Sequence, residues 1–396
     1  MSGRRWTVSD SNHSHSRTWR GWRRVVLVSL ALSALGGGIW LSIPGRPALP
    51  RLAVLRSEGA KAEIPLEFSP DGAILATRNE HGQVTLWDVA THRPRSSTKQ
   101  FAADLPVAFS PDSRLFAASR WERAPIFHVV SVIEIVTGRK LMTVDVGKPV
   151  LSDLRFSPDG STFHLTALDP NPSPPTPTKS WVVRTWNTET WRESPADAVS
   201  VVKPWRTFER VGAVSHDGGI VATLDPYAPD VALWDAVTGA KLSTLPTPLA
   251  PPATGNYVCE FSPDRQTLAV GRNSLGLLEL WDIPTRKVRQ TFRGLGRGDR
   301  IESVRFASGS SRNLVSTVSN WDFATSLVWQ VIDKLERSVF GKPVRMIPND
   351  VVVWDMQTVR VRARLKGETW GIISADGSTL ATGGYGGVTL WDITSK

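Results

Sequence analysis

The sequence lacks the residue patterns on which most recognisable enzyme chemistry depends. Cys259 is the only cysteine, which excludes an intramolecular disulfide, a Cys-x-x-Cys redox pair and a cysteine-cluster zinc site. It contains no His-Glu-x-x-His, Gly-x-Ser-x-Gly or Gly-x-x-x-x-Gly-Lys motif. The seven histidines show no spacing typical of a metal site. We therefore predict no catalytic residue, no cofactor and no metal site, and expect that the protein is not an enzyme.

Charge is absent from residues 25–43, "VVLVSLALSALGGGIWLSI". At about 1.5 Å per residue, a helix of this length spans roughly 28 Å, close to the hydrocarbon thickness of a bilayer. Trp22 and Trp40 lie near its ends, where interfacial aromatic rings are enriched. We predict a transmembrane signal-anchor helix here. The alternative is export after cleavage of a signal peptide, although no Ala-x-Ala site follows soon after the apolar run.

The flanks of this segment predict its orientation. Residues 1–24 carry six arginines, and we expect them to form a disordered cytoplasmic tail under the positive-inside rule. The linker, residues 44–49, reaches at most about 20 Å when extended. We therefore expect a single-pass membrane protein whose main body, residues 50–396, lies outside the cytoplasm and close to the bilayer.

The net charge of +10 does not predict a nucleic-acid partner once it is located along the chain. Residues 1–24 contribute +5 and residues 44–63 contribute +2, which leaves +3 for more than 300 other residues. A nearly neutral body does not provide the basic surface that phosphate backbones require. We expect no nucleic acid among the partners.

Turn residues and tryptophan, by contrast, are plentiful: the chain has 31 Gly, 28 Pro and 17 Trp. A segment resembling "FSPDG" recurs seven times, and its first residues are Phe68, Phe109, Phe156, Val214, Phe261, Phe306 and Ile373. The spacings are 41, 47, 58, 47, 45 and 67 residues. Most lie near the roughly 40 to 45 residues of a four-stranded propeller blade, and the two long spacings indicate insertions.

Each repeat has the same internal order, as in "FSPDRQTLAVGRNSLGLLELWDIPTRKVRQTF". A strand, a Ser-Pro-Asp turn, a second strand, a third strand ending in Trp-Asp and a fourth strand follow one another. The Trp-Asp pairs are Trp87-Asp88, Trp234-Asp235, Trp281-Asp282, Trp354-Asp355 and Trp391-Asp392. We assign the same position to Ile135-Val136 in the second repeat and to Trp186-Asn187 in the third. The repeated aspartates are expected to stabilise turns.

These residues resemble the WD-repeat family of β-propellers over essentially all of residues 50–396. The resemblance implies an all-β fold: a seven-bladed β-propeller of four-stranded antiparallel blades, here preceded by one transmembrane helix. In this family the outermost strand of the last blade often comes from the N-terminal end of the domain. We therefore expect residues 49–59 to pair with "VTLWDI" near the C-terminus. No Gly-His dipeptide occurs, so the family's usual His-to-Trp hydrogen bonding is not expected in its usual form.

Residues 321–350 allow two interpretations. "SLVWQVIDKLERSVF" has the apolar spacing of a helix, but it can also be read as a strand pair with Trp329 in the Trp-Asp position. In the second case, "VVVWDMQTVRVRARL" would belong to a partial extra blade. We favour seven blades with an insertion.

The function suggested by this organisation is a membrane-tethered, non-catalytic protein-interaction scaffold. Extra sequence collects in the loops between second and third strands, and such one-sided insertions often mark a binding face. From these top-face loops we select Trp121, Pro174, Pro175 and Trp181 as candidate contacts for a protein partner of unknown identity; residues 25–43 would contact the lipid bilayer. The alternative is an enzyme or small-ligand binder that uses the central channel, which requires polar side chains converging at the ring axis.

Overall fold

The computed structural model describes most of the predicted body of the protein. The described residues are 49–98, 106–123, 126–147, 151–168, 181–194, 200–202, 210–224, 230–236, 238–246, 257–272, 277–292, 299–307, 310–320, 349–358 and 360–394. The predicted tail, the predicted membrane segment and all of the linker except Leu49 lie outside them. Two compact parts are distinguished, Met1–Pro47 and Ala48–Lys396, and every strand belongs to the second. Nowhere in the described ranges is there a helix with the length and apolarity needed to cross a membrane.

The described part of the second region is all-β: strands β1 to β28 form five four-stranded antiparallel sheets and one eight-stranded sheet, in which β2 pairs with β27. We divide the larger sheet into two four-stranded units, units 1 and 7. Unit 1 contains β2 (Ala62–Phe68), β3 (Ile74–Asn79), β4 (Val84–Asp88) and β5 (Arg93–Thr98). Unit 2 contains β6 (Val107–Phe109), β7 (Leu115–Arg123), β8 (Ile126–Glu134) and β9 (Lys140–Gly147). Unit 3 contains β10 (Leu151–Phe156), β11 (Thr162–Leu168), β12 (Trp181–Asn187) and β13 (Ser200–Val202).

The remaining units follow the same order along the chain. Unit 4 contains β14 (Arg210–Val214), β15 (Ile220–Leu224), β16 (Val231–Asp235) and β17 (Lys241–Leu245). Unit 5 contains β18 (Tyr257–Phe261), β19 (Thr267–Arg272), β20 (Leu277–Asp282) and β21 (Lys287–Phe292). Unit 6 contains β22 (Asp299–Ala307), β23 (Ser310–Asn320), β24 (Asp350–Asp355) and β25 (Arg360–Lys366). Unit 7 contains β26 (Gly371–Ile373), β27 (Thr379–Tyr385), β28 (Gly387–Asp392) and β1 (Arg51–Leu55).

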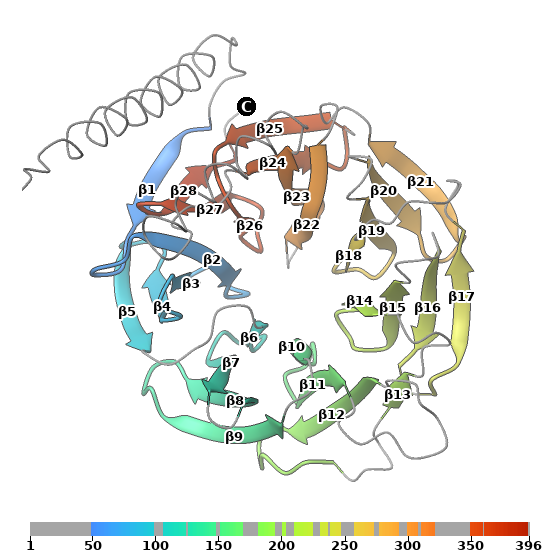
Figure 1. The fold of residues 1–396 in the computed structure, drawn as a ribbon, viewed down its shortest axis with the longest axis horizontal. Coiled ribbons are helices and arrows are strands. Elements are labelled where there is room, and N and C mark those ends of the chain that lie inside the picture. The colour runs from blue at the N-terminus through green and yellow to red at the C-terminus, as the bar shows by residue number, and fades with distance from the viewer. Residues whose placement is uncertain are drawn as a thin grey trace, which may run out of the picture. The chain divides into compact units, whose positions relative to one another are not determined.

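The units follow one another around a common centre, which gives a propeller-like arrangement (Figure 1). The first strand of each unit is innermost, and β2, β6 and β10 contact one another in turn, as do β14, β18, β22, β26 and β2. Apolar clusters fill the space between successive units; one combines Leu224 of unit 4 with Phe261 and Trp281 of unit 5. Burial of these large side chains between sheets is the main stabilising contribution.

The turns of the Ser-Pro-Asp type are built alike in six units, although His216 and Ala375 replace the proline in units 4 and 7. In unit 1, Ser69 Oγ donates to Asp71 Oδ1 at 2.6 Å and accepts from the Ile74 N–H at 2.9 Å. Asp71 Oδ1 also accepts from the Ala73 N–H at 3.0 Å. The same Ser-to-Asp bond joins Ser110 to Asp112, Ser157 to Asp159, Ser215 to Asp217, Ser262 to Asp264 and Ser374 to Asp376. The expected structural role of these aspartates is confirmed.

The indole N–H at the Trp-Asp position has a partner within its own unit in five units, and in unit 5 Trp281 Nε1 donates to Glu279 Oε2 at 3.3 Å. Trp87 Nε1 donates to Thr77 Oγ1 at 2.8 Å, and the corresponding bonds join Trp234 to Thr223, Trp354 to Ser316 and Trp391 to Thr382. A hydroxyl on the second strand therefore accepts the indole N–H in these four units. Buried indole groups need such a partner, because leaving the N–H unpaired would cost about 1–3 kcal/mol.

The assignment of Ile135-Val136 to this position in unit 2 was wrong. Strand register pairs Phe116 with Ile133, as it pairs Leu75 with Trp87 in unit 1, so the position belongs to Ile133-Glu134. The reason is the turn that follows. Glu134 Oε2 accepts from the Thr137 hydroxyl three residues later at 2.5 Å, which is the role that a carboxylate oxygen of Asp88 plays for Thr91.

The predicted closure of the ring by the first strand is confirmed. Strand β1 pairs antiparallel with β28, with Val54 opposite Thr389 and Leu55 opposite Val388. The Asp392 N–H donates to the Pro50 carbonyl at 2.8 Å, and Leu55 is buried against apolar side chains of units 7 and 1. Both ends of the propeller-like region therefore lie in one sheet (Figure 1).

Unit 6 resolves part of the ambiguity over residues 321–350. Strand β24 pairs with β23 on one side and with β25 on the other. Trp354 lies opposite Leu314, so "VVVWDMQTVRVRARL" completes unit 6 and is not a partial extra blade. This agrees with an insertion between β23 and β24. Residues 321–348, including Trp329, lie outside the described residues.

Candidate functional site

The four residues chosen from the sequence lie in units 2 and 3. Trp121 is part of β7, opposite His128 in β8, so "WERAPIF" mainly lengthens two paired strands and is not the long loop expected from the sequence. Trp181 is the first residue of β12, opposite Leu168 in β11 and Val202 in β13. Pro174 and Pro175 fall between β11 and β12, outside the described residues.

A group of charged side chains that the sequence did not reveal lies at the ring centre; we call it the axial cluster. Its members are Glu67 of unit 1, Asp153 and Arg155 of unit 3, Glu260 of unit 5 and Arg305 of unit 6. The Glu67 carboxyl is influenced by the charges of all the others. Because these units are not all neighbours, such proximity requires that the side chains converge near the axis.

Two ion pairs organise the axial cluster. Arg305 Nη1 lies 3.1 Å from Glu260 Oε2 and so joins unit 6 to unit 5. Arg155 Nη2 lies 2.7 Å from Asp153 Oδ2, and Arg155 Nη1 donates to the Ser215 carbonyl of unit 4. The side chain of Arg305 remains 58% exposed, so its guanidinium is accessible to solvent.

Glu67 is the titratable member of this group. Burial raises the pKa of its carboxyl to about 8, and the nearby Arg305 opposes the rise only in part. Its Oε2 atom is buried and has no hydrogen-bond partner among the described residues. Burial also lowers the pKa of His216, which is influenced by the charges of Glu260, Arg155 and Asp153 of the cluster. At neutral pH, Glu67 therefore holds its proton and His216 is uncharged.

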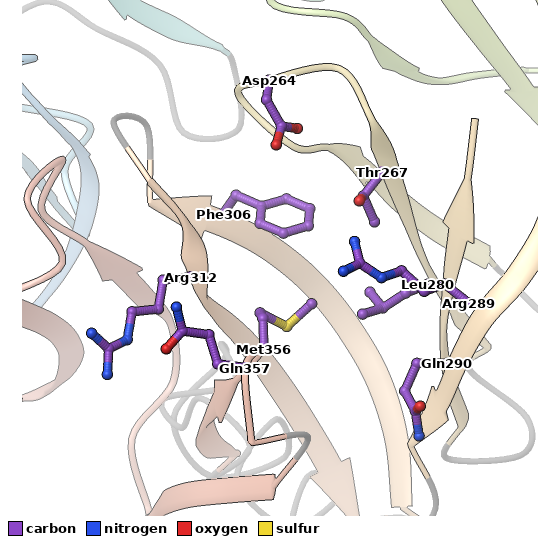
Figure 2. Close-up of a pocket in the computed structure, with 9 residues that line it drawn as sticks. All are labelled: Asp264, Thr267, Leu280, Arg289, Gln290, Phe306, Arg312, Met356 and Gln357. Carbon is purple, nitrogen blue, oxygen red and sulfur yellow. The ribbon is translucent and has the colours of Figure 1, made fainter. Parts of the chain in front are cut away.

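A cavity of about 560 Å³ opens between units 5 and 6 (Figure 2). Its lining residues are Asp264, Thr267, Leu280, Arg289, Gln290, Phe306, Arg312, Met356 and Gln357. The side chains of Leu280, Phe306 and Met356 face one another, and the guanidinium of Arg289 projects among them from β21. The Arg312 guanidinium points away from this space. The cavity thus combines an apolar wall with one inward-facing cation.

Units 1 and 4 carry a larger side chain than unit 5 beside this space, whereas units 3 and 7 also have threonine there, Thr162 and Thr379. The residue whose N–H donates to the turn serine is Ile74 in unit 1 and Ile220 in unit 4, but Thr267 in unit 5. Ile74 packs in one cluster with Ile135 of the next unit, and Ile220 packs in one cluster with Ile283. In unit 5 the shorter threonine stands at this position, and unit 6 contributes the unbranched Met356.

Comparison with known proteins does not assign the chain to a family. No protein-family model matches the chain, and a search of curated proteins found no relative. The resemblance to WD-repeat proteins therefore rests on the repeated sequence pattern alone. Within the described ranges, no three His, Cys, Asp or Glu side chains are grouped so that they could hold a metal ion.

Proposed function

We propose that the chain is a seven-bladed β-propeller of the WD-repeat type that works as a membrane-tethered, non-catalytic protein-interaction scaffold. Residues 25–43 would anchor it, with the propeller outside the cytoplasm. The observation that supports this most is ring closure by β1, since a closed ring provides a rigid frame for the loops that it carries. The recurring Ser, Asp and Trp side chains support the same proposal, because their polar atoms are used within the turns and strands.

The surface proposed for partner binding is the end of the ring opposite the Ser-Pro-Asp turns. Two long connections between second and third strands emerge there, from Leu168 to Trp181 in unit 3 and from Asn320 to Asp350 in unit 6. Trp121, Pro174, Pro175 and Trp181 remain the proposed contact residues. Insertions gathered at one end of a repeat ring favour binding there.

This proposal is tested by partner capture on intact cells that express the full chain. A membrane-impermeant amine cross-linker is added before lysis, and complexes are purified through a C-terminal tag. We expect at least one protein to be captured by the wild type and lost when residues 169–180 and 321–348 are replaced by short Gly-Ser links. Arg114→Ala, on the turn end, is the control and should retain it. Identical captured proteins from all three would contradict the proposal.

A second candidate is a small-ligand binder that uses the ring centre, and the axial cluster favours it. Arg305 is held by Glu260 yet accessible, as a residue that receives an anionic group would be. Thermal unfolding of the full chain in detergent would be followed with a panel of amino acids and dicarboxylates. We expect one class to raise Tm by a few degrees in the wild type and not in Arg305→Gln. A wild type unaffected by the whole panel would remove this candidate.

A further inference from the structure

We propose that the cavity between units 5 and 6 binds a partner peptide in which an apolar side chain lies next to a carboxylate. This would be a second interaction surface. It lies at the turn end of the ring, since Asp264 belongs to the turn that follows the first strand of unit 5 and Arg312 lies near the start of β23. It does not depend on the loops at the opposite end.

The apolar half of the cavity suits one large side chain. Phe306 and Leu280 are buried and form fixed walls on β22 and β20, whereas Met356 is only partly buried. Methionine is unbranched and adapts its shape to what it contacts. An aromatic or branched aliphatic side chain entering between these residues would be removed from water, which stabilises a complex by roughly 1.5–3 kcal/mol when burial is complete.

The charged half is provided by Arg289, whose guanidinium projects into the cavity (Figure 2). Arg289 is exposed, and its charge is felt by the carboxylate of Asp282, which also accepts from the Thr285 hydroxyl at 2.6 Å. An arginine fork matches a carboxylate through two parallel hydrogen bonds. Asp264, at the rim, directs one of its oxygens into its own turn, where it accepts from the Ser262 hydroxyl at 2.5 Å and from the Gln266 N–H at 3.0 Å.

The dimensions and the polar rim favour a peptide as the occupant. A volume of about 560 Å³ lies within the usual range for bound small groups and holds one or two residues, not a folded domain. Gln357 places an amide at the rim, which can both donate to and accept from a peptide backbone, whereas the Gln290 amide points away from the apolar side chains and donates to the Thr291 carbonyl at 3.5 Å (Figure 2). A free organic acid shares the carboxylate and the apolar group but would leave the Gln357 amide without a backbone partner.

The test uses two peptides that differ only in charge. Acetyl-Gly-Ser-Gly-Phe-Glu-Gly-amide and the same peptide with Gln in place of Glu are titrated against the full chain in detergent micelles, with empty micelles as blank. Binding is read by saturation-transfer NMR from the phenylalanine ring protons. We expect the glutamate peptide to bind at least about tenfold more tightly, since a charge-assisted pair is stronger than a neutral one.

Two variants and a matched control locate the binding. Arg289→Gln should lower affinity for the glutamate peptide to that for the glutamine peptide. Thr267→Ile, which copies Ile220 of unit 4, should weaken both peptides by about tenfold or more because it fills the apolar space. Arg95→Gln alters the arginine at the equivalent position of unit 1 and should change neither affinity. Thermal unfolding of each variant confirms that it is folded.

Several outcomes would overturn the inference. These are no binding of either peptide at millimolar concentration, equal affinity for the two peptides, or affinities unchanged in both cavity variants. 3-Phenylpropionate is included as a free acid, and binding as tight as that of the glutamate peptide would assign the cavity to small acids. None of these results tests the binding surface proposed at the opposite end of the ring. Partners of that surface are measured separately by capture on cells.

Discussion

Gly387→Ala is expected to lower the free energy of unfolding by roughly 3–6 kcal/mol, because it forces β1 away from β28. Gly387 has φ 124°, a conformation that side chains rarely adopt, and a Cβ there would lie 2.2 Å from the carbonyl oxygen of Leu55. The neighbouring strand must therefore shift, and Leu55 would leave its buried position. Thermal unfolding of the full chain in detergent, followed by tryptophan fluorescence, measures the effect.

Gly386→Ala is the matched control for this substitution. Gly386 has φ 98°, so alanine is strained there too, but a Cβ would meet nothing within 4 Å. We expect the free energy of unfolding to fall only by the cost of backbone strain, about 1–3 kcal/mol.

Deleting residues 49–59 should destabilise the ring at least as much as Gly387→Ala, since it removes β1 entirely. Equal losses in the two alanine variants, or a deletion that melts at the parent temperature, would contradict closure by β1.

The free energy of unfolding of the wild type is expected to fall as pH rises because of Glu67. The variant Glu67→Gln should not show this fall. The folded protein has a Glu67 pKa of about 8, above the ordinary value of 4.5. The unfolded chain therefore loses this proton first, so the contribution of Glu67 is fully present below about pH 4.5 and is lost as pH approaches 8. Between these two pKa values, the ionisation of Glu67 should lower the free energy of unfolding of the wild type by at most roughly 5 kcal/mol. Urea unfolding at pH values from 5 to 9 measures it.

Glu63→Gln is the control on the same strand. Glu63 is 1% exposed and its oxygens accept from the Ser57 N–H at 3.0 Å and the Thr77 hydroxyl at 2.5 Å. Replacing this carboxylate weakens charge-assisted bonds, and we expect a loss of about 1–3 kcal/mol at neutral pH. Glu67→Gln should instead be neutral or stabilising above pH 8. If the free energy of unfolding of Glu67→Gln falls between pH 5 and 8 as steeply as that of the wild type, Glu67 does not cause the fall.

The repeat and the closure of the ring were predictable from the sequence because both depend on local patterns. A Ser-Pro-Asp turn is determined by bonds within a few residues, as those of Ser69 and Asp71 show. The unpartnered strand at residues 49–59 and the unpartnered edge near the C-terminus left only one arrangement that pairs both. Unit 2 was misassigned because it lacks the Trp-Asp pair, although Thr137 three residues after Glu134 carried the signal.

Neither the axial cluster nor the cavity was predictable in this way. Glu67 and Arg305 each precede the phenylalanine of a repeat, where a charged residue resembles any solvent-facing strand position. Their proximity depends on how units 1 and 6 are placed around the ring, which no local pattern encodes. The cavity depends on Thr267 and Met356 meeting across two units. A search of the residue before each repeat phenylalanine would have found four of the five charges, all except Asp153, but not which of them converge.

Hydrogen exchange at β1 is the most direct measurement of how the ring is closed. The full chain in detergent micelles is exchanged into deuterated buffer, and peptides covering Arg51–Leu55 and Gly387–Asp392 are followed by mass spectrometry. We expect both segments to exchange slowly and at similar rates, and both to lose protection together in Gly387→Ala. Complete exchange of Arg51–Leu55 within seconds, while Gly387–Asp392 stays protected, would show that β1 is not part of the ring.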